Sequence, residues 1–121
     1  MKNGFLLIVL LLFFLIPPIF AGEADVIGVK VRKMGENLYQ FDVTVSHEDT
    51  GWDHYADKWE VLDDKGEIFG TRILHHPHVN EQPFTRSLSD VEIPKNITSV
   101  IIRAHDSVHQ YGGKVANVQL P

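Results

Sequence analysis

The sequence contains no cysteine among its 121 residues. This absence excludes disulfide bonds, thiolate nucleophiles and thiolate metal ligands, and we therefore expect no lipid anchor on a cysteine side chain. Small exported domains often depend on disulfides, so a domain folded from this chain must be held by its apolar core. Any transition-metal site must be built from imidazole and carboxylate ligands.

Basic residues are also scarce. The chain has 11 lysines and arginines against 16 aspartates and glutamates, which gives a net charge of −5. Removing Lys2 leaves 10 basic residues against 16 acidic ones, a net charge of −6. Because nucleic acids and anionic membrane surfaces attract basic proteins, we expect no nucleic-acid partner and no membrane association of the mature domain.

Only one long apolar run is present, and it lies at the N-terminus. Lys2 precedes an apolar stretch over residues 5–21, with small residues near its end. This layout predicts a signal peptide over residues 1–21, with cleavage as late as residue 24. An uncleaved anchor is the alternative, but the 17-residue stretch contains two prolines, and a spanning helix needs about 20 residues. We therefore expect an exported protein, periplasmic or secreted, with one domain over residues 24–121.

Helical periodicity is absent from the rest of the chain, and short segments alternate between apolar and polar residues instead. A period of two predicts half-buried strands. Seven strands are expected, at about residues 27–32, 39–45, 59–61, 68–74, 84–93, 97–104 and 114–120. Asp63–Gly66 reads as a hairpin turn, and the fifth strand as irregular near Ser89-Asp90. The pattern predicts an all-β, seven-stranded antiparallel sandwich of immunoglobulin or fibronectin type III kind, with Trp59 on the third strand.

Histidines are confined to every second connection of this predicted sandwich. Antiparallel strands return every second connection to the same end, so residues 46–55, 75–83 and 105–113 are expected to share one end, here called the histidine pole. These loops hold all seven histidines, and no lysine or arginine occurs in residues 46–57, 74–85 or 104–113. Loops on a rigid β-scaffold commonly carry binding groups, so we expect a patch of imidazole and carboxylate without a cation.

Imidazole and carboxylate are the usual ligands of Zn²⁺ and Cu²⁺ where thiolates are missing. The sequence therefore predicts a divalent transition-metal site at the histidine pole, and Asp106 could serve there as a ligand or orient an imidazole. Cu⁺ fits less well, because Met34 is the only methionine after residue 21 and belongs to the other end. The expected ligands are His76, His78, His105 and His109, followed by His75, His54 and Glu81.

Other interpretations remain open. The histidines could be solvated or could hold the loops together through pairs such as His105-Asp106. A metal-free protein-interaction or adhesion domain could use the same pole, where Trp52, Tyr55, Phe84 and Tyr111 lie in or beside the loops. An enzyme is not favoured: His105-Asp106-Ser107 contains the residue types of a triad, but triad members meet through the fold and not through adjacency. No catalytic residue is therefore assigned.

Three segments resemble a small family of exported bacterial immunoglobulin-like domains. They read WDHYADKWEV over residues 52–61, HHPHVNEQPFTRSL over residues 75–88 and RAHDSVH over residues 103–109. The resemblance covers nearly all of residues 24–120. It implies the fold and export, but it supplies no activity and no catalytic residues, because the function of that family is uncharacterised.

Overall fold

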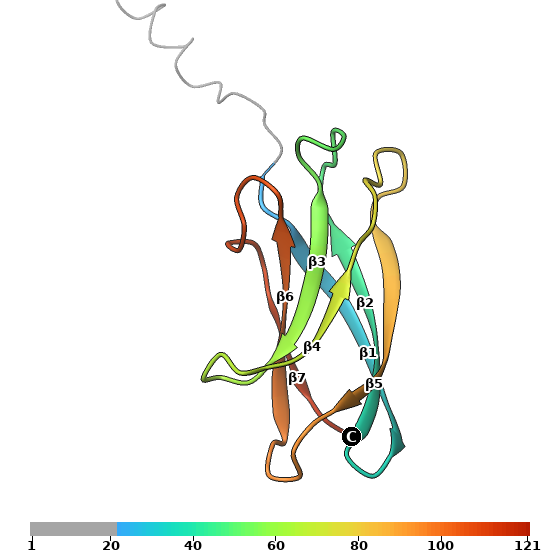
Figure 1. The fold of residues 1–121 in the computed structure, drawn as a ribbon, viewed down its shortest axis with the longest axis vertical. Helices are drawn as coiled ribbons and strands as arrows, with labels where there is room; N and C mark the ends of the chain where they lie inside the picture. The colour runs from blue at the N-terminus through green and yellow to red at the C-terminus, as the bar shows by residue number, and fades with distance from the viewer. Residues whose placement is uncertain (1–21) are drawn as a thin grey trace, which may run out of the picture.

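The computed structural model describes residues 22–121, which form strands and loops without a helix. No helix in this part of the chain is long and apolar enough to cross a membrane. The predicted signal peptide falls on residues 1–21, outside the described residues. The seven predicted strands are present (Figure 1): β1 Asp25–Gly35, β2 Leu38–Ser46, β3 Ala56–Leu62, β4 Ile68–Ile73, β5 Phe84–Glu92, β6 Ser99–Asp106 and β7 Ala116–Gln119.

The strands form two antiparallel sheets that pack face to face. One sheet has three strands in the order β1-β2-β5, and the other has four in the order β4-β3-β6-β7. In the first sheet Val43 lies opposite Val29 on one side and Arg86 on the other. In the second, Trp59 on the central strand β3 lies opposite Arg72 of β4 and Ala104 of β6.

The core lies between the sheets and is built from the inward positions of the central strands. Burial alternates along β2 and β6, as a period of two requires. Trp59 and Phe41 have no exposed surface, and burying a large apolar side chain fully contributes about 1.5–3 kcal/mol. The inward residues of β2 and β6 are Tyr39, Phe41, Val43 and Val45, and Val100, Ile102 and Ala104.

The predicted hairpin turn and the predicted irregularity are both present. Asp63 Oδ1 accepts hydrogen bonds from the backbone N–H groups of Lys65 at 2.9 Å and Glu67 at 2.8 Å, and Gly66 adopts a φ of 88°. Glycine is favoured at this left-handed position because it has no Cβ. In β5, Asp90 has a φ of 57°, and the pairing of β2 with β5 shifts register between Tyr39 and Phe41.

All sheet pairings are antiparallel, so the β2–β3, β4–β5 and β6–β7 loops lie at one end (Figure 1, top). Two details differ from the expectation. Strand β6 continues to Asp106, two residues beyond its predicted end, so that His105 and Asp106 belong to a strand. The pole also has a cation, because Arg86 of β5 extends its guanidinium to Glu81 at 3.3 Å and His78 at 3.0 Å.

Candidate metal centre

Two strands deliver polar side chains to the end of the core. The burial alternation of β2 continues past its last residue, so His47 and Asp49 are buried while Glu48 is exposed. The alternation of β6 ends with Asp106, which follows Ala104 on the inward face and has no exposed surface. Because β2 and β6 belong to different sheets, His47 and Asp106 meet across the sandwich at its histidine pole.

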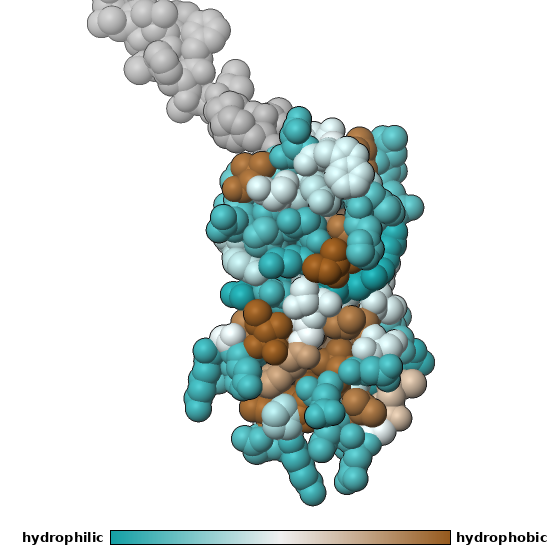
Figure 2. Space-filling view, in the orientation of Figure 1, coloured by the Kyte–Doolittle hydropathy of each residue, from teal (hydrophilic) through white to brown (hydrophobic). Residues whose placement is uncertain are grey.

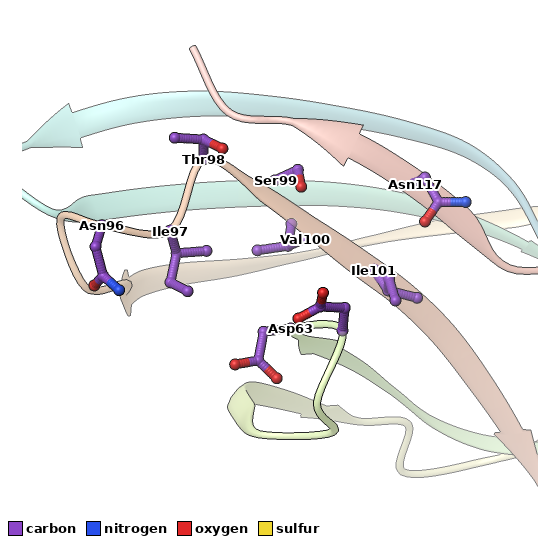
Figure 3. A pocket seen from close by; sticks show the side chains of 9 residues that line it. Asp63, Asn96, Ile97, Thr98, Ser99, Val100, Ile101 and Asn117 are labelled. Carbon is purple, nitrogen blue, oxygen red and sulfur yellow. The ribbon is translucent and has the colours of Figure 1, made fainter.

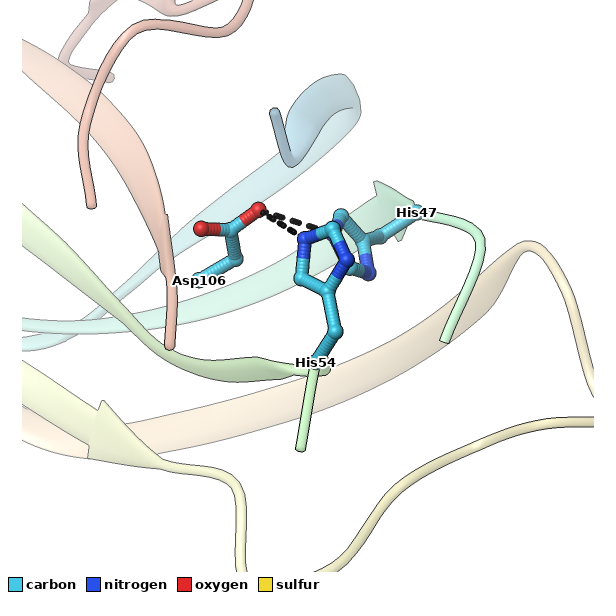
Figure 4. Close-up of side chains that lie close together, drawn as sticks. All are labelled: His47, His54 and Asp106. Atoms are coloured by element: carbon cyan, nitrogen blue, oxygen red, sulfur yellow. Dashed lines mark hydrogen bonds and ion pairs between the residues drawn. The ribbon is translucent and has the colours of Figure 1, made fainter. Parts of the chain in front are cut away.

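Three imidazole nitrogens approach one oxygen of Asp106. Its Oδ2 lies 2.9 Å from His47 Nε2, 3.0 Å from His54 Nε2 and 3.1 Å from His109 Nδ1. Figure 4 shows the His47 and His54 rings on the same side of the carboxylate. One ligand atom each from His47, His54 and Asp106 lies within 4.8 Å of the others. These three residues therefore could hold a metal ion.

The other oxygen of Asp106 organises the start of the β6–β7 loop. Asp106 Oδ1 accepts hydrogen bonds from the backbone N–H groups of Val108, His109 and Gln110, the first at 3.1 Å and the last at 3.0 Å. Burial raises the pKa of the Asp106 carboxyl, but the hydrogen bonds from His109, His54 and His47 lower it more strongly. The net effect holds the pKa of Asp106 well below its ordinary value, so the group is an anion at neutral pH.

Asp106 has more potential donors than it can accept. Three N–H groups face Oδ1 and three ring nitrogens face Oδ2, whereas a carboxylate offers about four lone-pair sites. The three ring nitrogens therefore cannot all be satisfied by donating to Oδ2. A cation placed among them would accept the lone pairs of neutral imidazoles and would retain the carboxylate as a further ligand.

Asp49 orients His47 from the far side of the ring. Asp49 Oδ1 lies 2.5 Å from His47 Nδ1 and accepts a hydrogen bond from the Ala56 N–H at 3.0 Å. Its Oδ2 accepts the His78 N–H at 2.7 Å. A proton on Nδ1 directed at this carboxylate would leave the Nε2 lone pair available to a bound cation, in place of the hydrogen bond to Asp106. This carboxylate–histidine arrangement is the usual second layer of a metal site.

His54 is held by a tight loop that leads into β3. The backbone N–H of Thr50 donates to the His54 carbonyl at 3.0 Å, and the His54 N–H donates to the Gly51 carbonyl at 3.2 Å. The imidazole packs against two others, with ring centroids 4.8 Å from His47 and 4.9 Å from His109. Its side chain is 14% exposed, so this edge of the cluster is open to solvent.

The predicted ligands from the β4–β5 loop make other contacts. His78 is buried and stacks on Phe84 with ring centroids 4.0 Å apart. Its burial lowers its pKa, and the Arg86 guanidinium lowers that pKa further. His76 is exposed beside His78, with ring centroids 4.7 Å apart, while His75 and Glu81 are exposed.

His105, the remaining predicted ligand, lies on β6 between the inward-facing Ala104 and Asp106. Its Nδ1 lies 2.5 Å from Asp57 Oδ1, and its ring makes an edge contact with Tyr111 at 4.8 Å. Of the seven predicted ligands, the structure thus brings His54 and His109 to the Asp106 carboxylate, together with His47. The other five make no hydrogen bond to Asp106.

His47 was absent from the expected ligand set, and Asp106 was considered there as a ligand or as a group that orients an imidazole. A signal for both was present in the alternation of the neighbouring strands. Extending the inward positions of β2 from Val45 by two residues gives His47, and extending those of β6 from Ala104 by two gives Asp106. Polar residues at inward positions have to be paired, because burying an unpaired charge is costly.

A hollow at the opposite end of the sandwich offers less chemistry. It has a volume of about 260 Å³ and lies beside the β3–β4 turn, with Asp63, Asn96 and Asn117 among its lining residues (Figure 3). No histidine lines it, and Oδ1 of Asp63 already accepts two backbone N–H groups of the turn.

On the face shown in Figure 2, hydrophilic residues predominate in the upper half, toward the histidine pole.

Comparison with known proteins gives one informative relative. A protein of Halomicrobium mukohataei described as "Putative lipoprotein" is 42% identical to this chain over 92 residues, which cover 76% of this chain and 45% of the relative. The chain thus spans less than half the length of that relative. No family model matches the chain. No solved structure matches it either.

Proposed function

We propose that this domain binds a divalent transition-metal ion at the histidine pole, through His47, His54 and Asp106, with His109 as a fourth ligand. The observation that supports this proposal is the approach of three ring nitrogens to a single buried carboxylate oxygen. The orientation of His47 by Asp49 supports it independently. The predicted ligands His76, His78, His75, His105 and Glu81 are not part of the proposed set.

The donor set points to Zn²⁺ or Cu²⁺. Three imidazoles and one carboxylate match the nitrogen and oxygen ligands of both ions, and no sulfur is available to favour Cu⁺. In a tetrahedral site with metal–ligand distances of 2.0–2.1 Å, the donors lie about 3.3 Å apart. The ring nitrogens now lie 2.9–3.1 Å from Asp106 Oδ2, so metal entry would move them slightly away from that oxygen.

Calorimetric titration of the tag-free mature domain with Zn²⁺ and Cu²⁺ at pH 7.5 and 5.5 tests the proposal. We expect one ion per chain and weaker binding at pH 5.5, because protons compete for imidazole. His54→Ala should weaken binding at least tenfold. This histidine is chosen because its side chain is partly exposed, so its removal should disturb the core less than removal of His47.

The matched control is His76→Ala, which truncates an exposed imidazole at the same pole. It should bind metal as the wild type does. Equal losses in His54→Ala and His76→Ala would assign the ligands to a different set. Weak binding of several ions that is insensitive to His54→Ala would contradict a specific site altogether.

The second candidate is a metal-free interaction or adhesion domain that uses the same pole. Trp52 is 66% exposed and Val108 is 54% exposed, and Trp52 packs edge-on against Tyr55 at 5.5 Å. Exposed aromatic side chains on loops can anchor a protein partner. This candidate is favoured if metal binding fails while Trp52→Ala abolishes association with a partner isolated by cross-linking on the surface of the source cell.

We also propose that the sandwich is of immunoglobulin or fibronectin type III kind and that the protein is exported. The first proposal is supported by the division of the strands into a sheet of three and a sheet of four. The fourth strand, β4, pairs with β3 in the four-stranded sheet and does not join the three-stranded sheet. The second is supported by the apolar N-terminal run of the sequence and by the name of the Halomicrobium relative. Mass spectrometry of the protein recovered outside the cytoplasm would identify its mature N-terminus.

A further inference from the structure

Among the four proposed ligands, His109 is the most exposed and the least constrained by the core. Its side chain is 36% exposed, compared with 14% for His54 and 0% for His47. His109 lies in the loop between β6 and β7, whereas His47 and Asp106 continue the inward-facing positions of strands β2 and β6. With His109 in place the centre has four protein ligands; without it, three protein ligands leave a position for water or a small exogenous ligand.

The β6–β7 loop is fastened on its inner side by Asp106. The backbone N–H of Gln110 donates to the Asp106 carbonyl at 3.1 Å, and the Asp106 N–H donates to the Gln110 carbonyl at 3.0 Å. These bonds, with those to Asp106 Oδ1, close a tight loop around His109. Gln110 has a φ of 63°, a left-handed backbone conformation at the end of this tight loop.

The next residue, Tyr111, fastens the loop on the outer side of the β4-β3-β6-β7 sheet. Its hydroxyl donates to Glu60 Oε1 at 2.8 Å, and the Arg103 guanidinium lies 3.9 Å from the centre of its ring. Arg103 Nε in turn donates to Glu60 Oε1 at 2.9 Å. Glu60 is only 3% exposed, so the partner that receives Tyr111 is itself fixed.

We infer that Tyr111, clamped by Glu60 and Arg103, is the positioning residue for His109 and thereby sets whether the metal centre has three or four protein ligands. This inference rests on the proposed metal-binding function. The clamp itself contains no proposed ligand, since Glu60, Arg103 and Tyr111 act on the far side of the sheet. Loss of the clamp would free the part of the β6–β7 loop that Asp106 does not hold, and His109 would then leave the fourth coordination position open.

Zn²⁺ titrations of Tyr111→Ala, His109→Ala and the double variant test the inference as a double-mutant cycle. Loss of a group that orients a ligand typically weakens metal binding by about 10–100-fold. We expect Tyr111→Ala to weaken binding about as much as His109→Ala, and the double variant to bind no more weakly than His109→Ala. Val115→Ala, which shortens an exposed side chain in the same loop, should bind as the wild type does.

The mobility of the loop can also be measured without metal, alongside the double-mutant cycle. Hydrogen–deuterium exchange of the backbone amides of residues 108–110 should accelerate in metal-free Tyr111→Ala and stay near the wild-type rate in Val115→Ala. Tyr111→Phe keeps the ring on Arg103 but loses the bond to Glu60. It should therefore lie between the wild type and Tyr111→Ala in both assays, and it provides a milder variant if the alanine variant folds poorly.

Two results would overturn the inference alone: binding in Tyr111→Ala equal to that of the wild type, or the same fold-loss from Tyr111→Ala in the presence and absence of His109. The second result would mean that Tyr111 acts on general stability and not through His109. Failure of the proposed function is a different outcome, in which the wild type binds no Zn²⁺ or binds it without dependence on His54, and it would overturn both.

Discussion

Replacing Asp49 by asparagine removes one charge from the base of the proposed centre while keeping the side-chain shape. Asp49 is 5% exposed. Its two oxygens face three donors: His47 Nδ1 at 2.5 Å, the Ala56 N–H at 3.0 Å and the His78 N–H at 2.7 Å. Asparagine has one accepting oxygen, so its amide NH₂ must face a donor on one of the two sides.

The cost in free energy of unfolding can be worked out from these contacts. With the amide oxygen toward His47 and Ala56, the His78 N–H is left buried without an acceptor, which costs about 1–3 kcal/mol. The two remaining hydrogen bonds lose their charged acceptor, which costs about 1 kcal/mol each. The expected loss in Asp49→Asn is thus about 3–5 kcal/mol, and for a domain of about 100 residues the melting temperature should fall by more than about 10 °C.

Urea unfolding in the presence of EDTA measures this loss without any contribution from metal. Glu48→Gln is the matched control, since it makes the same chemical change one residue away on an exposed side chain. It should change the free energy of unfolding by less than about 0.5 kcal/mol. If Asp49→Asn also stays within that limit, the buried hydrogen bonds of Asp49 do not stabilise the protein and the reasoning is refuted.

Three further outcomes are expected. Hydrogen bonds hold the pKa of Asp106 below its unfolded value of about 3.9. The stabilisation that the Asp106 anion gives the folded state is therefore present above about pH 4 and is lost as the pH falls further. The difference in unfolding free energy between the wild type and Asp106→Asn should thus shrink from pH 7 to pH 3. His78 should titrate by NMR below about 6.5, and Arg86→Gln should raise its pKa only partly, because burial is the larger cause of the shift. Zn²⁺ at one hundred times its Kd should raise the free energy of unfolding by about 2.7 kcal/mol in the wild type, and the same Zn²⁺ concentration should raise it much less in His54→Ala.

Much of the fold could be predicted from the sequence, because one period describes most of it. Alternation identified all seven strands, and Gly66 and the prolines marked connections between them. Strand ends were less certain: the first strand reaches Gly35, and β6 begins at Ser99 and ends at Asp106. These ends depend on pairing with neighbouring strands, which local alternation does not report.

The location of the candidate site could also be predicted from the sequence. The residues that form it could be predicted only in part. Antiparallel connectivity brings the histidine-bearing loops to one end, and this was readable from the strand count. The ligand list favoured the dense run around His76, although density along the chain does not require side chains to converge. His78 instead packs on Phe84 and His105 pairs with Asp57, contacts that depend on the approach of other strands.

The position of the cluster would tie the proposed metal binding to the stability of the sandwich. His47 and Asp106 lie at the ends of β2 and β6, the second and sixth strands, and both side chains have no exposed surface. In antibody domains a disulfide joins the second and sixth strands across the core, whereas this chain has no cysteine. The histidine–carboxylate contact therefore links the two sheets between the same pair of strands, but at the end of the core.

This position divides the proposed ligands into two classes. Removing one member of the buried His47–Asp106 pair takes a hydrogen bond from a group that stays buried, which costs about 1–3 kcal/mol. His54 and His109 reach the same carboxylate oxygen from loops and keep part of their surface in water. Substitutions of His47 or Asp106 should thus lower stability and metal affinity together. Substitutions of His54 or His109 should lower affinity with a much smaller loss of stability, which makes these two residues the ones that can separate metal binding from folding.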